Sequence, residues 1–195
     1  MKRLACLCLL PLLAISACRQ TAPQAKASAP TVAAEAMVAN LYKAVTARQQ
    51  FVGLSDRKAF APYFSKALLH LFDDNDACFE DWKRQNPGTT DKPPFAIELG
   101  IFSGGSEQSE PQTFSIEKTE SRKDGSLRVY VKLALTKPYA LVWHVGAVVV
   151  RESGRPVVDD IIYLKDEYND DEGRLSRALM NEPDCKGPRF VGWRG

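Results

Sequence analysis

The chain has 195 residues, of which 45% are hydrophobic and 26% are charged, with 12 Gly and 12 Pro. This balance excludes a collagenous or wholly disordered chain, and the length suits one domain. The net charge of +2 comes from Lys2 and Arg3, because the rest of the chain carries 24 basic and 24 acidic residues. The basic excess typical of nucleic-acid-binding proteins is therefore missing.

The first 17 residues have the order of an export signal. Lys2 and Arg3 precede an apolar run over residues 4–15, and the small residues Ser16 and Ala17 follow it. A helix that spans a bilayer needs about 20 apolar residues, so this shorter run predicts a cleaved segment. We expect the protein to leave the cytoplasm.

The end of this segment, Ile15-Ser16-Ala17-Cys18, resembles the lipobox of bacterial lipoproteins. The resemblance implies cleavage before Cys18 and a lipid anchor on that residue. The alternative is an ordinary signal peptide with a chance cysteine at its end. Residues 18–30 are rich in Ala and Pro, which predicts a flexible tether between the membrane and a domain over residues 31–195. Arg19 replaces the Asp that retains enterobacterial lipoproteins in the inner membrane, so the outer membrane is favoured.

The cysteines that remain after this processing form one possible pair. Cys6 and Cys8 leave with the signal and Cys18 takes the lipid, so Cys78 and Cys185 are the thiols left in an oxidising compartment. We expect them to form a disulfide bond, with two free buried cysteines as the alternative.

The first half of the domain shows helical periodicity. Residues 31–50 have apolar side chains three and four positions apart, and Gly53 follows as a stop signal. A second apolar pattern begins near residue 60, with Ser55 as the expected N-cap and a break near Pro62, and it continues to about residue 85. We expect two short helices or one kinked helix there. The Pro- and Gly-rich residues 86–94 predict a loop.

The second half changes to the alternation of strands. Residues 127–135 are apolar at every second position, and Asp124-Gly125 predicts a hairpin back to a strand over residues 114–120. Residues 141–151 are apolar on both faces and predict a central strand. Ser153-Gly154 predicts a turn that leads into the next strand, over residues 157–165. A short helix is expected over residues 171–181. The sequence therefore predicts an α+β fold, with N-terminal helices on a curved four-stranded antiparallel sheet and a short C-terminal helix.

Several segments stand out as motifs: LGIFSGGSE at residues 99–107, TFSIEK at 113–118, the strand around Trp143, RPVVDDIIYL at 155–164, and LSRAL at 175–179 followed by CKGP at 185–188. Together they resemble a family of small bacterial envelope lipoproteins of unassigned function. The resemblance implies a cone-shaped fold like that of nuclear transport factors or cystatins. Related domains include immunity proteins of bacterial toxin systems. The resemblance brings no catalytic residues with it.

The usual signatures of enzyme chemistry are missing from the sequence. The two histidines, His70 and His144, belong to no zinc motif, and the acidic residues 73–76 lack the Gly and the closing Glu of a calcium loop. Residues 100–104 do not match the nucleophile motif of hydrolases, and no Lys follows Gly104-Gly105-Ser106 as a phosphate-binding loop requires. We expect no metal, no cofactor and no catalytic residue.

Asp159-Asp160 is the pair of residues best suited to acid–base chemistry. A buried Asp160 could act as the base of an isomerase with a tyrosine such as Tyr163 or Tyr130 as a proton donor, and the candidate pocket consists of Trp82, His144, Asp160 and Tyr163. The favoured interpretation is that the carboxylate binds backbone amides or an Arg and fixes the sheet to a helix. Trp82 and Trp143 are expected in the core.

Two other features are candidates for contact with a partner protein. The loop after residue 101 is long and polar, and its tip can protrude into a partner. The acidic run near residue 166 and Trp193 in the tail can add contacts. The simpler alternatives are that the loop is a plain connector, that the acidic run is a solvated surface and that the tail is loose. The candidate partner-binding residues are Ser103, Gly104, Gly105, Ser106, Glu107, Asp166, Glu167 and Trp193.

These observations lead to one leading hypothesis and one alternative. The leading hypothesis is a non-enzymatic lipoprotein facing the periplasm that binds another protein, specifically an immunity protein that neutralises a secreted antibacterial effector. The alternative is a cone that binds a small molecule or lipid in the cell envelope and that could be isomerase-like.

Overall fold

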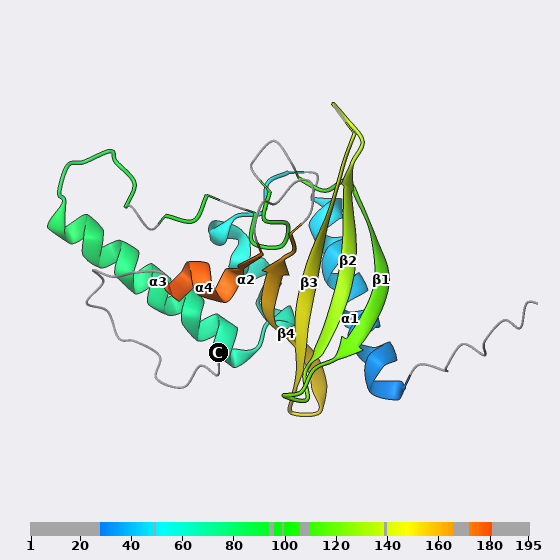
Figure 1. Cartoon of the computed structure of the whole chain (residues 1–195). Coiled ribbons are helices and arrows are strands. Elements are labelled where there is room, and N and C mark those ends of the chain that lie inside the picture. The colour runs from blue at the N-terminus through cyan, green and yellow to red at the C-terminus, as the bar shows by residue number, and fades with distance from the viewer. Residues whose placement is uncertain are drawn as a thin grey trace, which may run out of the picture.

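The computed structural model of the chain describes residues 28–48, 50–93, 96–98, 100–105, 110–138, 140–165 and 172–180. Helices precede a five-stranded antiparallel sheet with strand order β1-β2-β3-β4-β5, and a short helix follows it (Figure 1). The predicted α+β class is confirmed. The sheet is open and has one strand more than predicted.

The first helix, α1 (Ala29–Ala47), begins two residues before the predicted start at Thr31. Pro30 lies in its first turn, where a missing backbone N–H is tolerated, so part of the expected tether is helical. The buried side chains follow the helical spacing that the sequence predicted; they are Ala34, Val38, Leu41, Tyr42 and Val45.

The second helical region is divided at Pro62, as expected. The short α2 (Arg57–Phe60) ends before a 3-10 turn over Ala61–Tyr63, and the long α3 (Lys66–Gln85) follows. The expected N-cap was wrong, because Ser65, and not Ser55, caps α3 by accepting a hydrogen bond from the Leu68 N–H at 3.0 Å.

The sheet consists of β1 (Thr113–Ser121), β2 (Leu127–Leu135), β3 (Leu141–Glu152), β4 (Arg155–Tyr163) and β5 (Gly173–Arg174). The predicted hairpins are present, and their turns use the left-handed backbone expected of tight hairpins, with φ of 82° at Gly125 and Gly154 and 50° at Ser153. The two-residue β5 was not predicted, because it is too short to show a pattern.

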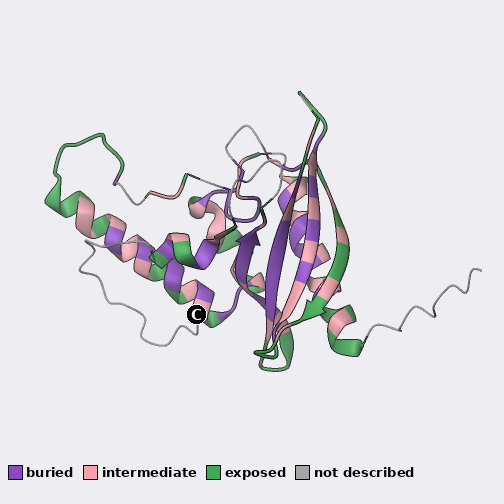
Figure 2. Ribbon diagram, viewed as in Figure 1, coloured by how far each residue is buried: buried purple, intermediate pink, exposed green. Residues whose placement is uncertain are grey.

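The two faces of the sheet differ. The face that packs against α1, called the inner face below, carries the core side chains of β2 and β3, such as Val131 and Trp143. Helices α3 and α4 (Leu175–Met180) contact β4 at the edge of the sheet. Figure 1 shows α1 behind the sheet and α3 and α4 beyond β4, and Figure 2 shows the buried stripe along β3 and β4.

The edge of β4 that faces away from β3 is partly paired. Phe64 forms a parallel bridge with Val158, and β5 pairs with Ile162 and Tyr163. Covering a strand edge in this way protects it from pairing with another chain. None of the helices within the described residues is long and apolar enough to cross a membrane.

Candidate functional site

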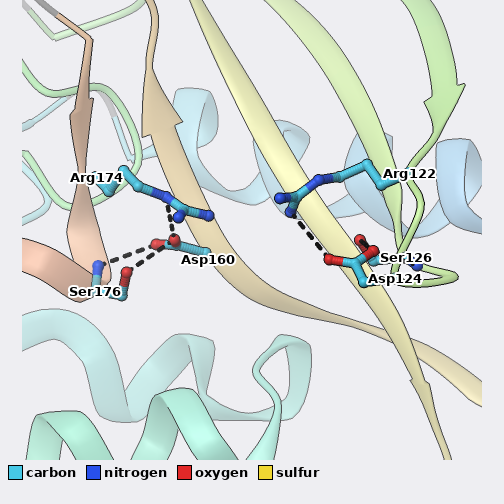
Figure 3. A network of polar contacts seen from close by, with 6 residues as sticks. All are labelled: Arg122, Asp124, Ser126, Asp160, Arg174 and Ser176. Carbon is cyan, nitrogen blue, oxygen red and sulfur yellow. Dashed lines mark hydrogen bonds and ion pairs between the residues drawn. The ribbon is translucent and has the colours of Figure 1, made fainter. Parts of the chain in front are cut away.

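Asp160 lies at the centre of a buried polar network between β4 and α4 (Figure 3). Its side chain is 1% exposed. Oδ1 accepts hydrogen bonds from the backbone N–H groups of Ile161 and Ser176, at 2.9 and 3.0 Å. Oδ2 accepts from the Ser176 hydroxyl at 2.8 Å and lies 3.0 Å from Nε of Arg174. The carboxylate therefore binds three donors and one cation.

The electrostatics of Asp160 fit a structural role. Burial raises the pKa of this carboxyl group, and the hydrogen bonds from Ser176 and the Arg174 charge oppose that rise. The backbone N–H of Ser176 belongs to the first turn of α4. There a carboxylate accepts hydrogen bonds from the free N–H groups and interacts favourably with the helix dipole. Asp160 holds the C-terminal helix to the sheet, which is the interpretation that the sequence favoured.

Asp159 fixes a different helix. It is the extra residue of a β-bulge, since Val148 pairs with Asp160 while Val149 pairs with Val158. Its Oδ1 accepts a hydrogen bond of 2.6 Å from the hydroxyl of Ser65, the N-cap of α3. Burial raises the pKa of Asp159, and the Ser65 bond opposes that shift. The adjacent carboxylates thus secure the starts of α3 and α4.

The proposed pairing of Asp160 with Tyr163 was wrong. Tyr163 pairs with Val145 on the inner face, whereas Asp160 pairs with Val148, whose side chain lies on the opposite face. The Tyr163 hydroxyl instead donates to the Ile101 carbonyl at 3.2 Å, and burial raises the pKa of this phenol strongly. A base and an acid on opposite faces of a sheet do not act on one substrate.

The other two members of the expected pocket lie on other elements than Tyr163. His144 lies on the same face as Asp160, half-buried, with Nε2 at 3.7 Å from the Glu117 carboxylate of β1. Trp82 is half-buried near the end of α3, so only Trp143 of the two expected core tryptophans is fully buried. The single pocket of Trp82, His144, Asp160 and Tyr163 is not formed.

The loop over residues 100–105 is held inside the protein, which corrects the expectation that Ser103, Gly104 and Gly105 protrude. Ser103 is 1% exposed and Gly105 is buried. Gly104 packs so closely on the Tyr163 ring that a Cβ would stand 2.7 Å from it. Ser103 and Gly105 therefore offer no surface to a partner, and Gly104 is half-buried.

Three aromatic side chains anchor the backbone of this loop. Tyr163 donates to the carbonyl of residue 101, Tyr42 to that of residue 102 at 2.8 Å, and Trp143 Nε1 to that of residue 103 at 2.9 Å. Buried carbonyls need such partners, because leaving one unpaired costs about 1–3 kcal/mol. The polar composition of the segment predicted an exposed loop. Instead, the carbonyls of residues 101–103 accept these three hydrogen bonds inside the protein.

Glu110 is a titratable residue that the sequence analysis missed. It is half-buried, and its Oε1 lies 3.4 Å from the Ser103 hydroxyl, which donates to it. Burial raises the pKa of Glu110 to about 7, and the negative charge of Asp56 adds to the rise. No catalytic motif surrounds it in the sequence, although it lies in the same polar segment as Ser103, seven residues further along the chain.

Over the described residues, the face opposite α1, called the outer face below, carries half-buried and exposed side chains along β1, β2 and the first residues of β3, whereas Gly146 and Val148 of β3 are buried on it. The register places Arg128, Tyr130 and Lys132 of β2 and Val142 and His144 of β3 on it, and Val142 is 46% exposed. On β1 the exposed residues Lys118 and Glu120 pair at 2.6 Å. Figure 2 shows exposed and intermediate residues along β1, and intermediate residues that alternate with buried ones along β2.

Other predicted site residues lie outside the described part of the chain. They are the lipidation residue Cys18, the disulfide partner Cys185, and the partner-binding candidates Ser106, Glu107, Asp166, Glu167 and Trp193. Cys78 is buried in α3, and its pairing with Cys185 stays a prediction.

Within the described ranges, no three His, Cys, Asp or Glu side chains gather as metal ligands would. No family model, curated protein or solved structure matches the chain.

Proposed function

We propose that this protein is a lipid-anchored envelope protein that faces the periplasm and binds another protein, a secreted antibacterial effector that it neutralises. We further propose that its helices and sheet form a cone of the nuclear-transport-factor-like class. The open outer face of β1–β3 is the observation that carries the binding proposal.

The outer face has the composition of a protein-binding surface. Tyr130 and Val142 provide apolar contact area, and tyrosine in particular contributes strongly to protein interfaces. Lys132, which pairs with His144, lies between them along the ladder, and the pair Lys118–Glu120 adds charge beside Tyr130, so the face mixes apolar and charged groups. Within the described residues, α1 is the main helix that packs on β1 and β2, and it lies on the inner face.

The contacts of the chemically capable groups also favour binding over catalysis. Asp160, Asp159 and Tyr163 are each committed to hydrogen bonds that join structural elements. The space between α1 and the sheet holds the ring of Phe102, which contacts Tyr42 and other aromatic rings. These contacts weaken the alternative of an isomerase-like cone.

The lipid anchor is tested by Cys18→Ser. The wild-type protein is expected in the membrane fraction and to be released by detergent, because acyl chains on Cys18 hold it there. The Cys18→Ser protein is expected to lose the lipid, shown by the mass of the purified chain. A mass difference between the two N-termini that equals only the exchange of Cys for Ser would refute lipidation.

Partner binding is tested by comparing two equivalent substitutions. Val142→Glu places a charge on the outer face, and Val32→Glu places one on α1 at a similarly exposed position, 53% against 46%. Exported Cys18→Ser protein is used as bait, and the partner is identified by mass spectrometry. We expect Val142→Glu to weaken binding by at least about tenfold, because an unpaired charge buried in an interface is costly, and Val32→Glu to have no effect.

The partner must also be an effector. The purified bait is expected to inhibit the captured enzyme at an equimolar ratio. Capture of no stoichiometric partner from secreted and periplasmic proteins would contradict the proposed function. A partner that binds both variants equally would instead place its site away from the outer face.

A further inference from the structure

The start of α1 lies at the same end of the domain as the turn between β1 and β2 (Figure 1). Thr119, near the end of β1, donates a hydrogen bond of 2.7 Å to Oε1 of Glu35, in the second turn of α1. Near the start of β1, the centre of the Phe114 ring lies 6.0 Å from that of Tyr42, further along α1. The helix therefore runs antiparallel to β1.

The turn between β3 and β4 and the start of α3 lie at this end as well. Leu127, the first residue of β2, pairs with Val149 near the end of β3. The carboxylate of Glu152, the last residue of β3, accepts from the N–H of Lys66, the first residue of α3, at 3.0 Å. The turn end, as it is called below, consists of the first turns of α1 and α3 and of residues 121–127 and 150–156.

The turn end carries cations without counter-charges. The side chains of Lys66, Lys123, Arg151 and Arg155 are exposed. Within the described residues none of these four side chains forms an ion pair, and Arg151 donates to the carbonyl of Gly154 at 2.8 Å. Their charges are therefore available to an anion from outside the domain.

The acids of the turn end are already bonded within the domain. Asp124 accepts from the backbone N–H and the hydroxyl of Ser126, at 2.9 and 2.6 Å, and lies 3.7 Å from Arg122 (Figure 3). Glu152 and the half-buried Asp159 beyond it bind the start of α3. The segments of the turn end hold five cations and two acids, although the chain after Arg3 is neutral overall. The positive charge is thus concentrated at this end.

The proposed lipid anchor reaches the domain through the same end. Residues 19–28 separate Cys18 from Ala29, the first residue of α1, and a chain of this length extends over at most about 40 Å. A lipid on Cys18 keeps the turn end within that distance of the bilayer, which raises its effective concentration at the surface. Basic side chains that come within about a Debye length of an anionic bilayer are attracted to it.

We propose that the turn end lies on the membrane surface, where Lys66, Lys123, Arg151 and Arg155 bind the headgroups of anionic phospholipids. The strands then lead away from the membrane, and the outer face of β1–β3 stands upright beside a soluble partner. The place of the domain at the membrane rests on the proposed lipid anchor. Its affinity for headgroups does not need the lipid and is tested without it.

Vesicle sedimentation of the mature Cys18→Ser chain tests the headgroup contact. The probes are vesicles of equal parts phosphatidylglycerol and phosphatidylcholine, and vesicles of phosphatidylcholine alone. Binding to the anionic vesicles is expected to be at least about tenfold stronger and to weaken with added salt. Lys123→Glu combined with Arg155→Glu is expected to weaken it by at least about tenfold, because each basic residue near an anionic surface contributes about fivefold.

Lys43→Glu combined with Lys137→Glu is the matched control, because it changes the net charge equally. Both residues are exposed and distant from the turn end, since Lys43 follows Tyr42 and Lys137 follows the end of β2. This variant is expected to keep most of the binding. A second measurement needs no substitution in the domain. On anionic vesicles, an amine reagent is expected to label Lys66 and Lys123 less than it does without vesicles, and Lys43 and Lys137 equally.

The failure of this proposal is distinct from that of the proposed function. Equal binding to both kinds of vesicle, no binding to either, or equal losses in the two double variants would overturn the membrane contact. Loss of partner capture by Lys123→Glu with Arg155→Glu, without a loss of vesicle binding, would overturn it too, because the turn end would then be a protein interface. The anchor and the partner site are judged separately, by the N-terminal mass and by Val142→Glu.

Discussion

Replacement of Asp160 by Ala is expected to lower the free energy of unfolding by about 3–5 kcal/mol, the usual cost of removing one partner of a buried charge pair. The substitution leaves the backbone N–H groups of Ile161 and Ser176 without their acceptor and Arg174 without its counter-charge. Equilibrium urea denaturation, followed by circular dichroism, measures this loss.

Two further variants show whether the loss belongs to this network. Glu120→Ala removes an exposed carboxylate that accepts from Tyr130, and its stability is expected to stay close to that of the wild type. Asp160→Asn keeps an oxygen for the bonds to Ile161 and Ser176 but places an amide beside Arg174, so an intermediate loss is expected. If Asp160→Ala were as stable as Glu120→Ala, the carboxylate would not be what holds α4 to the sheet.

Long periodic segments were predictable from sequence. The strict alternation over residues 127–135 predicted β2 with its bounds, because one face of that strand packs on α1 and the other meets water. The apolar spacing of α1 and the turns at Gly125 and Gly154 were predictable for equally local reasons. The two-residue β5 exists only because it pairs with β4, so nothing local could predict it.

The errors at the candidate site have distinct causes. Residues three apart on a strand point to opposite faces, so the alternation alone argued against pairing Asp160 with Tyr163. The burial of Ser103 was not predictable from its polar neighbours, because it depends on donors contributed by α1, β3 and β4. The apolar pair Ile101-Phe102 inside that polar segment is the signal that could have indicated burial.

The same loop gives the second large expected effect. Phe102→Ala is expected to destabilise the fold by about 3–5 kcal/mol, the range for truncating a buried aromatic ring. The Phe102 ring is 1% exposed and lies 4.7 Å from the centre of Phe60 and 5.7 Å from that of Phe64, so its removal leaves a cavity between α1, α2 and the sheet. Phe79→Ala in α3 is the control, because that ring is only half-buried and a smaller loss is expected.

Two glycine variants test how closely the loop over residues 100–105 packs on the core without removing an aromatic ring. Gly104 and Gly125 have positive φ angles of 69° and 82°, so Ala introduces comparable backbone strain at both. A Cβ at Gly104 would also stand 2.7 Å from the Tyr163 ring, whereas nothing lies within 4 Å of one at Gly125. Gly104→Ala is therefore expected to be the more destabilising in urea denaturation. Equal losses, together with a mild Phe102→Ala, would mean that the loop over residues 100–105 does not fill the core, and the space beneath it would then be open to a ligand.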